Sequence, residues 1–481
     1  MRGGHTTRGA AEWAALALAL AAACSPVRGV PDGGAGDDDD DATDAGTVDG
    51  SVEPGVVTVI VYGPDAQATA DPNRLVFFHA PDGTLVSTRM LDEDGRATEL
   101  VAPGGSVTVL TAVDEGEGSF TYVLHTVVGV QPLDTIQIGP RVPEPSWDQL
   151  GELVVNLAEE APDAVNHELR IGCEVVPLAS GENRIPYQDT RCTRGLTPVD
   201  YLVVARDDAG DPVAYSARLG AQLDTVLAYR IPLALNGWQT DFDRVRVKLN
   251  NVPPGVTGLS PEVGIYRRGL DYSFDFLAPT PVQGGQDVDA EVRIVGGLID
   301  RLQPRAQLVY GNPNAPAGFG FAARNVDATV RDVTLDLGTM VPARVTEATL
   351  LDFPGPNSHL DFTVVGPTDT ATMGMAGVTW RLDDPGGHTT QWEWVIAFPP
   401  DLSESVPLPD IGPNLHPSWP PPSEANLVAA IAGFMWMTHP ATWDEARQDR
   451  PFEVVESGGL RPDLPLGAEL GFTIGGRLGD L

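Results

Sequence analysis

Aromatic and acidic side chains gather near the end of this chain in a pattern that could bind a sugar. Six of the nine tryptophans fall between residues 380 and 443, and Trp392 and Trp394 flank Glu393. In a strand the two indoles would point to the same face, because side chains alternate between faces. The pair then forms either a stacking platform for sugar rings, with Glu393 beside it, or part of the core of a β-sandwich. We expect core packing and keep sugar stacking as the alternative.

The residues that most often carry catalysis form no known motif in this chain. The sequence has no G-x-S-x-G, H-E-x-x-H or P-loop pattern, and the histidines after His5 stand singly, without a second one at i+2 or i+4. The run Asp37–Asp41 and the pair Asp92 and Asp94 lack the ligand spacing of a calcium loop. We interpret the run as a solvated charge segment and the pair as part of a turn. We therefore expect a non-enzymatic protein with no metal site and no cofactor.

Cys24 ends a segment that has the composition of an export signal. A positive start with Arg2 and Arg8 precedes an uncharged apolar run, Trp13–Ala23, which is too short to span a bilayer as a helix. The residues Leu20-Ala21-Ala22-Ala23-Cys24-Ser25 resemble the lipobox of bacterial lipoproteins. The resemblance implies that Cys24 carries diacylglycerol and becomes the mature N-terminus, and that Ser25 favours the outer membrane. A plain signal cut near Ala23, which leaves Cys24 as a free thiol, is the alternative.

With Cys24 assigned to lipid, Cys173 and Cys192 are the remaining pair of cysteines. An exported protein matures in an oxidising compartment, where two such cysteines are expected to join. They have no His or Cys at zinc-binding spacing, and they are far from the C-x-x-C spacing of redox enzymes. We therefore expect a structural disulfide that stabilises its domain by about 3 kcal/mol.

The charge of the chain excludes one class of partner. Its 67 acidic and 30 basic residues give a formal net charge of −37, whereas nucleic-acid binding needs clustered Lys and Arg. Residues 25–53 are rich in Gly and Asp and cannot bury enough apolar surface to fold. We expect a disordered tether there that places the folded part on the order of 30 Å from the membrane.

From Gly55 onward, β-branched and aromatic runs of strand length alternate with turns rich in Gly, Pro and Asp. This pattern predicts an all-β fold of tandem Ig-like or transthyretin-like β-sandwich domains. The stretch from Phe77 to Val109 resembles the carboxypeptidase-regulatory-like (transthyretin-like) module, with an Asp-Gly hairpin and then an Asp-x-Asp-Gly turn before the next strand. In that family the module is an accessory or structural domain.

Strand and loop spacing divides the chain into six segments. Asn426–Met437 is compatible with a strand or a buried helix, and Thr442-Trp443-Asp444-Glu445 fits the capping box that begins a short helix. The segments are a signal peptide (1–23), the lipidated Cys24 with a disordered acidic linker (24–53), a β-sandwich module (54–148), a β-rich domain with the disulfide (149–244), a β-rich domain (245–324) and a Trp-rich β-sandwich domain (325–481).

Together these features predict an exported, lipid-anchored protein of the bacterial cell envelope, held at the outer membrane through Cys24. Its expected role is structural or binding, with a protein or polysaccharide of the envelope as partner. The alternative is a secreted carbohydrate-binding or carbohydrate-active protein that uses the Trp-rich C-terminal domain. Indoles exposed in a groove beside carboxylates would support a sugar site in this tryptophan cluster, and burial of Trp380, Trp392 and Trp394 would exclude a sugar site there.

Overall fold

The structure is a computed structural model that describes residues 53–478, apart from 69–73, 117, 142, 144, 158, 224–230, 233–236, 276–279, 283–284, 313–314, 342, 356, 413–418 and 453–459. Within these residues it consists of β-strands and two one-turn helices, α2 (Leu337–Met340) and α3 (Trp443–Ala446). The predicted all-β class is confirmed. No helix in the described ranges is both long enough and apolar enough to cross a bilayer.

One large sheet runs through the molecule. Its 14 described strands follow the order β17-β16-β20-β21-β30-β29-β26-β27-β6-β5-β2-β3, with β18 paired to β16 and β22 paired to β20. The strands are β2 (Arg74–His79), β3 (Leu85–Met90), β5 (Gly105–Gly116), β6 (Ser119–Val130), β16 (Val256–Arg267), β17 (Leu270–Asp271), β18 (Thr280–Pro281), β20 (Arg301–Asn312), β21 (Ala315–Arg324), β22 (Val326–Asp327), β26 (Met373–Asp383), β27 (Thr389–Phe398), β29 (Asn426–Met437) and β30 (Glu469–Leu478).

Two strand pairs of this sheet join segments that are far apart in sequence. β6 and β27 run parallel and align Tyr122 with Trp392 and Leu124 with Trp394. β21 and β30 run antiparallel and align Phe321 with Phe472. Each of these pairs connects residues that the strand spacing assigns to different domains. The modules are therefore joined by backbone hydrogen bonds as well as by side-chain packing.

At one end of the large sheet, two smaller sheets cover its opposite faces. The first has the order β4-β1-β7, from β1 (Gly55–Val61), β4 (Arg96–Val101) and β7 (Thr135–Ile138). Alternate residues of β1, Val57, Val59 and Val61, point into the core beneath it. The second has the order β24-β25-β28, from β24 (Arg344–Leu351), β25 (His359–Val365) and β28 (Ser405–Pro407), and it packs on the other face. This end is therefore a three-layer β-structure.

At the other end, three more sheets build two stacked sandwiches. The sheet β19-β15-β23 packs on β16 and β20, and the sheets β10-β9-β12-β13 and β11-β8-β14 pack on each other. Leu202 and Val204 of β12 lie in the core between the sheet β19-β15-β23 and the strands β16 and β20. Tyr201 and Val203, on the other face of β12, lie in the core between the sheets β10-β9-β12-β13 and β11-β8-β14. The strands are β8 (Gln149–Leu157), β9 (Asn166–Ile171), β10 (Glu174–Leu178), β11 (Gly181–Gln188), β12 (Val199–Arg206), β13 (Pro212–Ala221), β14 (Ile231–Pro232), β15 (Asp243–Asn250), β19 (Val288–Ile294) and β23 (Asp332–Asp336).

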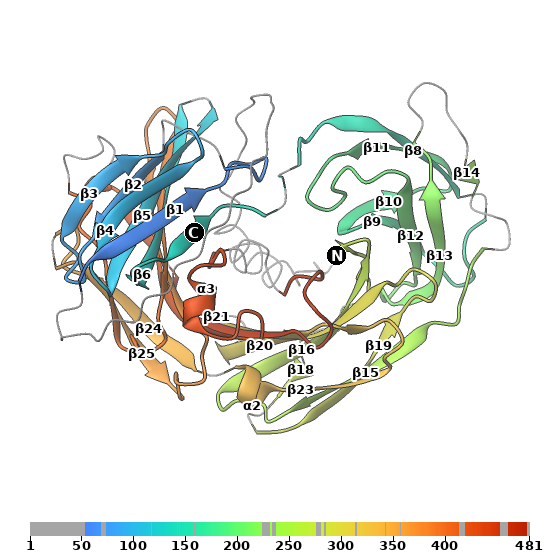
Figure 1. Cartoon of the computed structure of the whole chain (residues 1–481). Coiled ribbons are helices and arrows are strands. Elements are labelled where there is room, and N and C mark those ends of the chain that lie inside the picture. The colour runs from blue at the N-terminus through green and yellow to red at the C-terminus, as the bar shows by residue number, and fades with distance from the viewer. Residues whose placement is uncertain are drawn as a thin grey trace, which may run out of the picture.

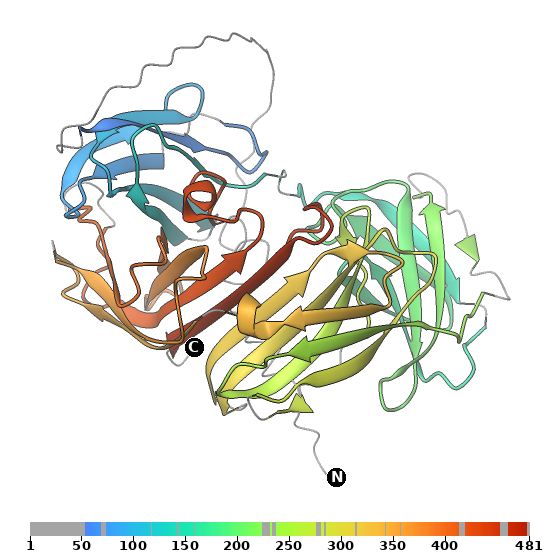
Figure 2. The same cartoon turned by 60° about the horizontal axis from the view of Figure 1, so that its bottom comes forward.

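The sandwiches follow one another along an arch. In Figure 1, β1–β6 lie at one end of the arch, β15–β23 at its bend, and β8–β14 at the other end. Figure 2 shows the red and orange C-terminal strands between the blue first module and the yellow strands of the bend, in agreement with the strand order of the large sheet. The arrangement confirms tandem β-sandwich units, here fused through a shared sheet.

Aspartates at fixed positions close several hairpins. The Asp92 carboxylate accepts hydrogen bonds from the N–H groups of Asp94 at 3.0 Å and Arg96 at 2.8 Å. Gly95 has φ +68°, a left-handed conformation that glycine adopts without strain. Asp207 makes the same pair of bonds in the β12–β13 hairpin. The interpretation of Asp92 and Asp94 as turn residues is confirmed.

Two local predictions near the end of the chain can also be compared with the structure. Asn426–Met437 is the strand β29, which resolves the choice between strand and helix. Thr442 caps α3, with its side chain accepting from the Glu445 N–H, so the predicted short helix is confirmed.

Candidate functional site

The tryptophans expected to form either a core or a sugar platform are buried. Trp392 and Trp394 on β27 have exposed fractions of 3% and 1%, and Trp380 on the neighbouring β26 has 5%. The Trp394 indole N–H donates to the Thr126 hydroxyl at 2.8 Å. Core packing is confirmed, and the alternative of a sugar-stacking platform at Trp392 and Trp394 is wrong.

The buried indoles form an aromatic cluster beneath the loops of the C-terminal part. Phe353 stacks on Trp380 with ring centroids 4.8 Å apart, and Trp419 meets Trp394 edge-on at 5.3 Å. Glu393 points to the opposite face of β27, because side chains alternate along a strand, and it is also buried. No sugar ring could reach both the indoles and this carboxylate. The cluster therefore stabilises the fold.

The predicted disulfide between Cys173 and Cys192 is present. It joins the β9–β10 turn to the loop that precedes β12. A Cβ on Gly172, which has φ +58°, would lie 1.9 Å from the Cys192 carbonyl oxygen, so the turn beside the disulfide requires glycine. Cys24, the predicted lipid site, lies outside the described residues.

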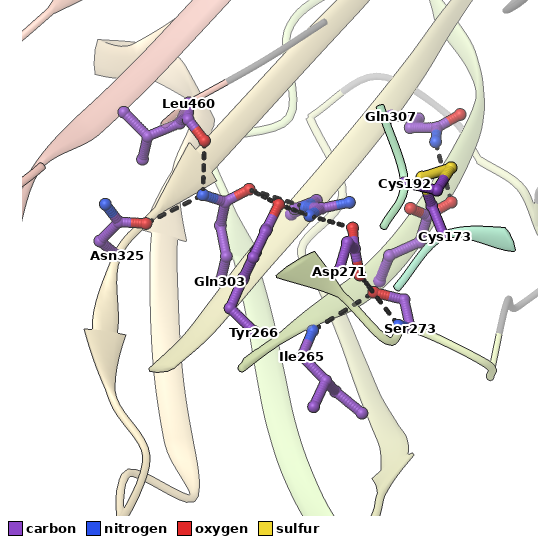
Figure 3. Close-up of polar contacts among 12 residues, drawn as sticks. Cys173, Cys192, Ile265, Tyr266, Asp271, Ser273, Gln303, Gln307, Asn325 and Leu460 are labelled. Atoms are coloured by element: carbon purple, nitrogen blue, oxygen red, sulfur yellow. Dashed lines mark hydrogen bonds and ion pairs between the residues drawn. A yellow bond between two sulfur atoms is a disulfide. The ribbon is translucent and has the colours of Figure 1, made fainter. Parts of the chain in front are cut away.

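A buried polar network lies where β16, β17 and β20 meet (Figure 3). The Arg305 guanidinium donates to Asp271 at 2.8 Å and to Gln303 at 2.8 Å, and it lies 5.4 Å from the centre of the Tyr266 ring. A Cβ on Gly264 would come within 2.4 Å of this guanidinium, so the missing side chain makes room for it.

The same network reaches the C-terminal part of the chain. The Gln303 amide donates to Asn325 at 2.9 Å and to the Leu460 carbonyl at 2.8 Å. Burial alone would raise the pKa of Asp271, but the charge of Arg305 and the hydrogen bonds from Ser273 and Arg305 hold that pKa below its usual range. Asp271 therefore stays ionised and paired, which suits a structural role better than proton transfer.

Two arginines of the disulfide-containing module share one carboxylate and donate to backbone carbonyls of the segment after β17. Glu168 accepts from Arg170 at 2.9 Å and from Arg206 at 2.8 Å. Arg206 also donates to the Phe274 carbonyl at 2.7 Å. The two ion pairs lie within the disulfide-containing module, and the bonds from Arg206 to the Phe274 carbonyl and from Arg170 to the Ser273 carbonyl attach that module to the segment after β17.

A second junction attaches α3 to the first module. Arg447, the C-cap residue of α3, donates to both carboxylate oxygens of Asp134, at 2.6 and 3.0 Å, and the two side chains are only 5% and 4% exposed. Asp134 also accepts from the Gln131 N–H at 2.7 Å. This bidentate buried pair has the geometry of a strong charge-assisted contact.

An open pocket of about 630 Å³ lies on the outer face of β24, β25 and β28. Its lining includes the carboxylates of Glu347, Asp361 and Glu404 together with several Ser and Thr hydroxyls. Among the described residues, no group of three or more His, Cys, Asp or Glu side chains is arranged to hold a metal. The pocket therefore offers hydrogen-bond donors and acceptors to a ligand.

One buried and one half-buried histidine, His79 and His125, lie within the first module. Burial lowers the pKa of His79 on β2 to about 4, although Nε2 lies 3.3 Å from the Asp410 carbonyl oxygen. Burial and the charge of Arg74 lower the pKa of His125 on β6 to about 4. Both rings are therefore neutral near pH 7 and belong to the core.

One exposed residue was missed by the sequence analysis. Trp147 precedes β8 and is 51% exposed, whereas the other tryptophans in the described ranges are buried or partly buried. It lies in a segment rich in Pro, Ser and Asp, a composition typical of surface loops. This composition could have predicted that Trp147 lies in a surface loop and is exposed.

Comparisons with known proteins identify no family for this chain. No protein-family model matches it, and no curated protein matches it in sequence. Among solved structures, the Bacillus anthracis TIE protein is similar at 7% identity with a TM-score of 0.14, over 59% of this chain and 50% of that protein. The match therefore spans half of the length of that protein.

Two further similar structures are the fimbrial anchor protein Mfa2 from Porphyromonas gingivalis and a tetra-tandem repeat from the extending region of a large adhesion protein. The first has 12% identity and a TM-score of 0.12, over 65% of this chain and 98% of that protein. The second has 12% identity and a TM-score of 0.12, over 79% of this chain and 94% of that protein. At these TM-scores, no conclusion about the function of this chain follows.

Proposed function

We propose that the protein is an exported, lipid-anchored protein of the bacterial cell envelope with a structural or binding role rather than a catalytic one. Cys24 attaches it to the outer membrane, and residues 25–53 form the tether to the folded part. Its partners are the membrane, through the lipid, and a protein or polysaccharide of the envelope.

The observation that best supports this proposal is the large sheet, which joins strands of three of the four predicted modules; the disulfide-containing module (β8–β14) lies outside it. A sheet of 14 described strands, with parallel pairing of β6 to β27, fixes the relative positions of modules that short linkers alone would leave free to move. The buried pair of Asp134 and Arg447 adds a further fixed point. A rigid arch of this kind can hold a binding surface at a set position beyond the membrane.

The polar groups in the described modules support the same proposal. Arg305, Asp271 and Gln303 are engaged with one another inside the fold, and so are Glu168 and Arg206. Groups held this way contribute to stability and to fixed geometry. Polar contacts of this kind are suited to a scaffold.

Metabolic labelling tests the anchor. Cells that express the full chain receive an alkyne-bearing fatty acid, and the label is then detected on the purified protein. We expect label on the wild type and none on Cys24→Ala, because the thioether forms at that sulfur. Cys192→Ala is the matched control, since it also removes a cysteine but leaves the lipid site, and it should be labelled like the wild type.

Fractionation of the same cells provides a second readout. A variant in which a cleavable secretory signal replaces residues 1–24 should leave the membrane fraction and appear in the soluble exported fraction. An unlabelled wild type, or a variant that stays in the membrane fraction to the same extent as the wild type, would contradict the proposal.

A further inference from the structure

The loop between β7 and β8 displays Trp147 in an unusual way. Trp147 is 51% exposed and has φ +60°, a left-handed backbone conformation that is an outlier for a bulky residue. Such a conformation persists only where the surroundings fix it, and it occurs often at binding sites. The hydrogen bonds of the neighbouring residues therefore show whether the backbone that carries this indole is fixed.

Asp189, the residue after β11, fixes the backbone on both sides of the indole. Its carbonyl accepts from the Trp147 N–H at 3.0 Å, and its carboxylate accepts from the Ser146 N–H at 2.8 Å. Its own N–H donates to the Asp148 carbonyl at 2.9 Å. Three hydrogen bonds thus tie residues 146–148 to the end of β11. An exposed ring on a fixed backbone loses little entropy when a ligand covers it.

Polar residues flank Trp147 along the chain and at the paired end of β11: Asp148 and Gln149 follow it, and Gln188 precedes Asp189, whose carbonyl accepts from the Trp147 N–H. Gln149 of β8 is the register partner of Gln188 of β11, and both are exposed, as is Asp148. Each glutamine amide has donors and an acceptor, and the aspartate adds an acceptor. A flat apolar face beside amides and a carboxylate matches a sugar ring, which has an apolar face of C–H groups and hydroxyls around its edge.

We propose that Trp147, with Gln149 and Gln188, forms a binding site for a neutral polysaccharide. The formal net charge of −37 disfavours a polyanionic glycan, because like charges repel. This inference deepens the binding role proposed above and rests on it, naming the class of ligand. The proposed sugar-stacking residue is thus Trp147, which is exposed, and not Trp392 or Trp394, which are buried.

Calorimetric titration of the full-length mature protein, purified in detergent, tests the site. The probes are linear hexasaccharides of β-1,4-linked glucose and of β-1,4-linked N-acetylglucosamine, with hexagalacturonate as the polyanionic probe. We expect at least one neutral probe to bind with a Kd below about 1 mM and hexagalacturonate to bind at least about tenfold more weakly. Trp147→Ala should weaken the neutral probe by about tenfold or more, the loss expected for an aromatic contact.

Two further variants separate binding from folding. Trp147→Gly should bind as weakly as Trp147→Ala without a lower Tm than the wild type, because glycine adopts φ +60° without strain. Leu133→Ala is the matched control, since Leu133 is also exposed, at 83%, and also has a positive φ, but lies in another loop; it should bind like the wild type.

The outcomes that would overturn the inference are separate from those of the anchor test. Failure of both neutral probes to bind, as expected if Trp147 contacts a protein instead, would overturn it. So would equal binding by the wild type and Trp147→Ala, or binding of hexagalacturonate as tight as that of the neutral probe. Each of these results would leave the labelling of Cys24 unaffected, so the inference and the lipid anchor can fail independently.

Discussion

Replacing Asp134 with Asn should destabilise the whole protein, because the change leaves the Arg447 guanidinium buried beside a neutral amide. The wild-type carboxylate receives two bonds from Arg447, at 2.6 and 3.0 Å, and one from the Gln131 N–H at 2.7 Å. Both charged side chains are about 95% buried. Breaking one side of a buried pair costs about 3–5 kcal/mol. Arg447 keeps its bond to Asp444, whose side chain is 78% exposed, so we expect a cost at the lower end of this range.

Urea denaturation followed by tryptophan fluorescence measures this cost. The buried Trp392 and Trp394 lie on the strand that pairs with β6, so their emission reports on the structure next to the junction. Because β6 and β27 belong to one sheet, we expect a single transition with a lower midpoint and an unchanged m-value. Two transitions in the wild type would refute the fixed relation between these modules.

An exposed ion pair is the matched control. Arg244 and Glu291 lie 2.9 Å apart, but their side chains are 64% and 58% exposed. Glu291→Gln should change the free energy of unfolding by less than about 1 kcal/mol, because water screens the pair. If Asp134→Asn costs no more than Glu291→Gln, the account of the Asp134–Arg447 junction is wrong.

Two other variants test the disulfide and the buried histidine. Cys192→Ser should lower the free energy of unfolding by about 3 kcal/mol, because opening the 19-residue span between the cysteines restores entropy to the unfolded chain; a Tm equal to that of the wild type under oxidising conditions would contradict this. Burial lowers the pKa of His79 in the folded protein to about 4, whereas in the unfolded chain the pKa is about 6.5. Between these two pH values the unfolded state binds one more proton than the folded state. The free energy of unfolding therefore falls as the pH drops from about 6.5 to 4. The full loss from this residue is about 3 kcal/mol. His79→Gln should flatten the pH dependence of the free energy of unfolding in that range, and an unchanged slope would argue against it.

Local sequence patterns predicted the strands and turns well, because the physical causes are local. Runs such as Arg74–His79 combine β-branched and aromatic residues, and the structure forms β2 over the same residues. Asp92 and Gly95 make a turn through hydrogen bonds within five residues. The pairing of Cys173 with Cys192 followed from export and from the cysteine count.

Contacts between distant segments could not be predicted in this way. The pairing of β6 with β27 and the contact of Asp134 with Arg447, 313 residues apart, depend on how complete layers pack. Alternation placed Trp392 and Trp394 on one face, but burial of that face depends on the sheet β24-β25-β28 that covers it. The fixed backbone at Trp147 likewise depends on Asp189, which follows β11, the strand that pairs with β8.

The most direct test of the proposed function is mass spectrometry of the mature N-terminus, on protein purified from the membrane fraction of cells that express the full chain. We predict an N-terminal peptide that begins at Cys24 and carries a diacylglyceryl thioether. A mature N-terminus at another residue, or an unmodified Cys24, would contradict the lipid anchor on which the proposed function depends.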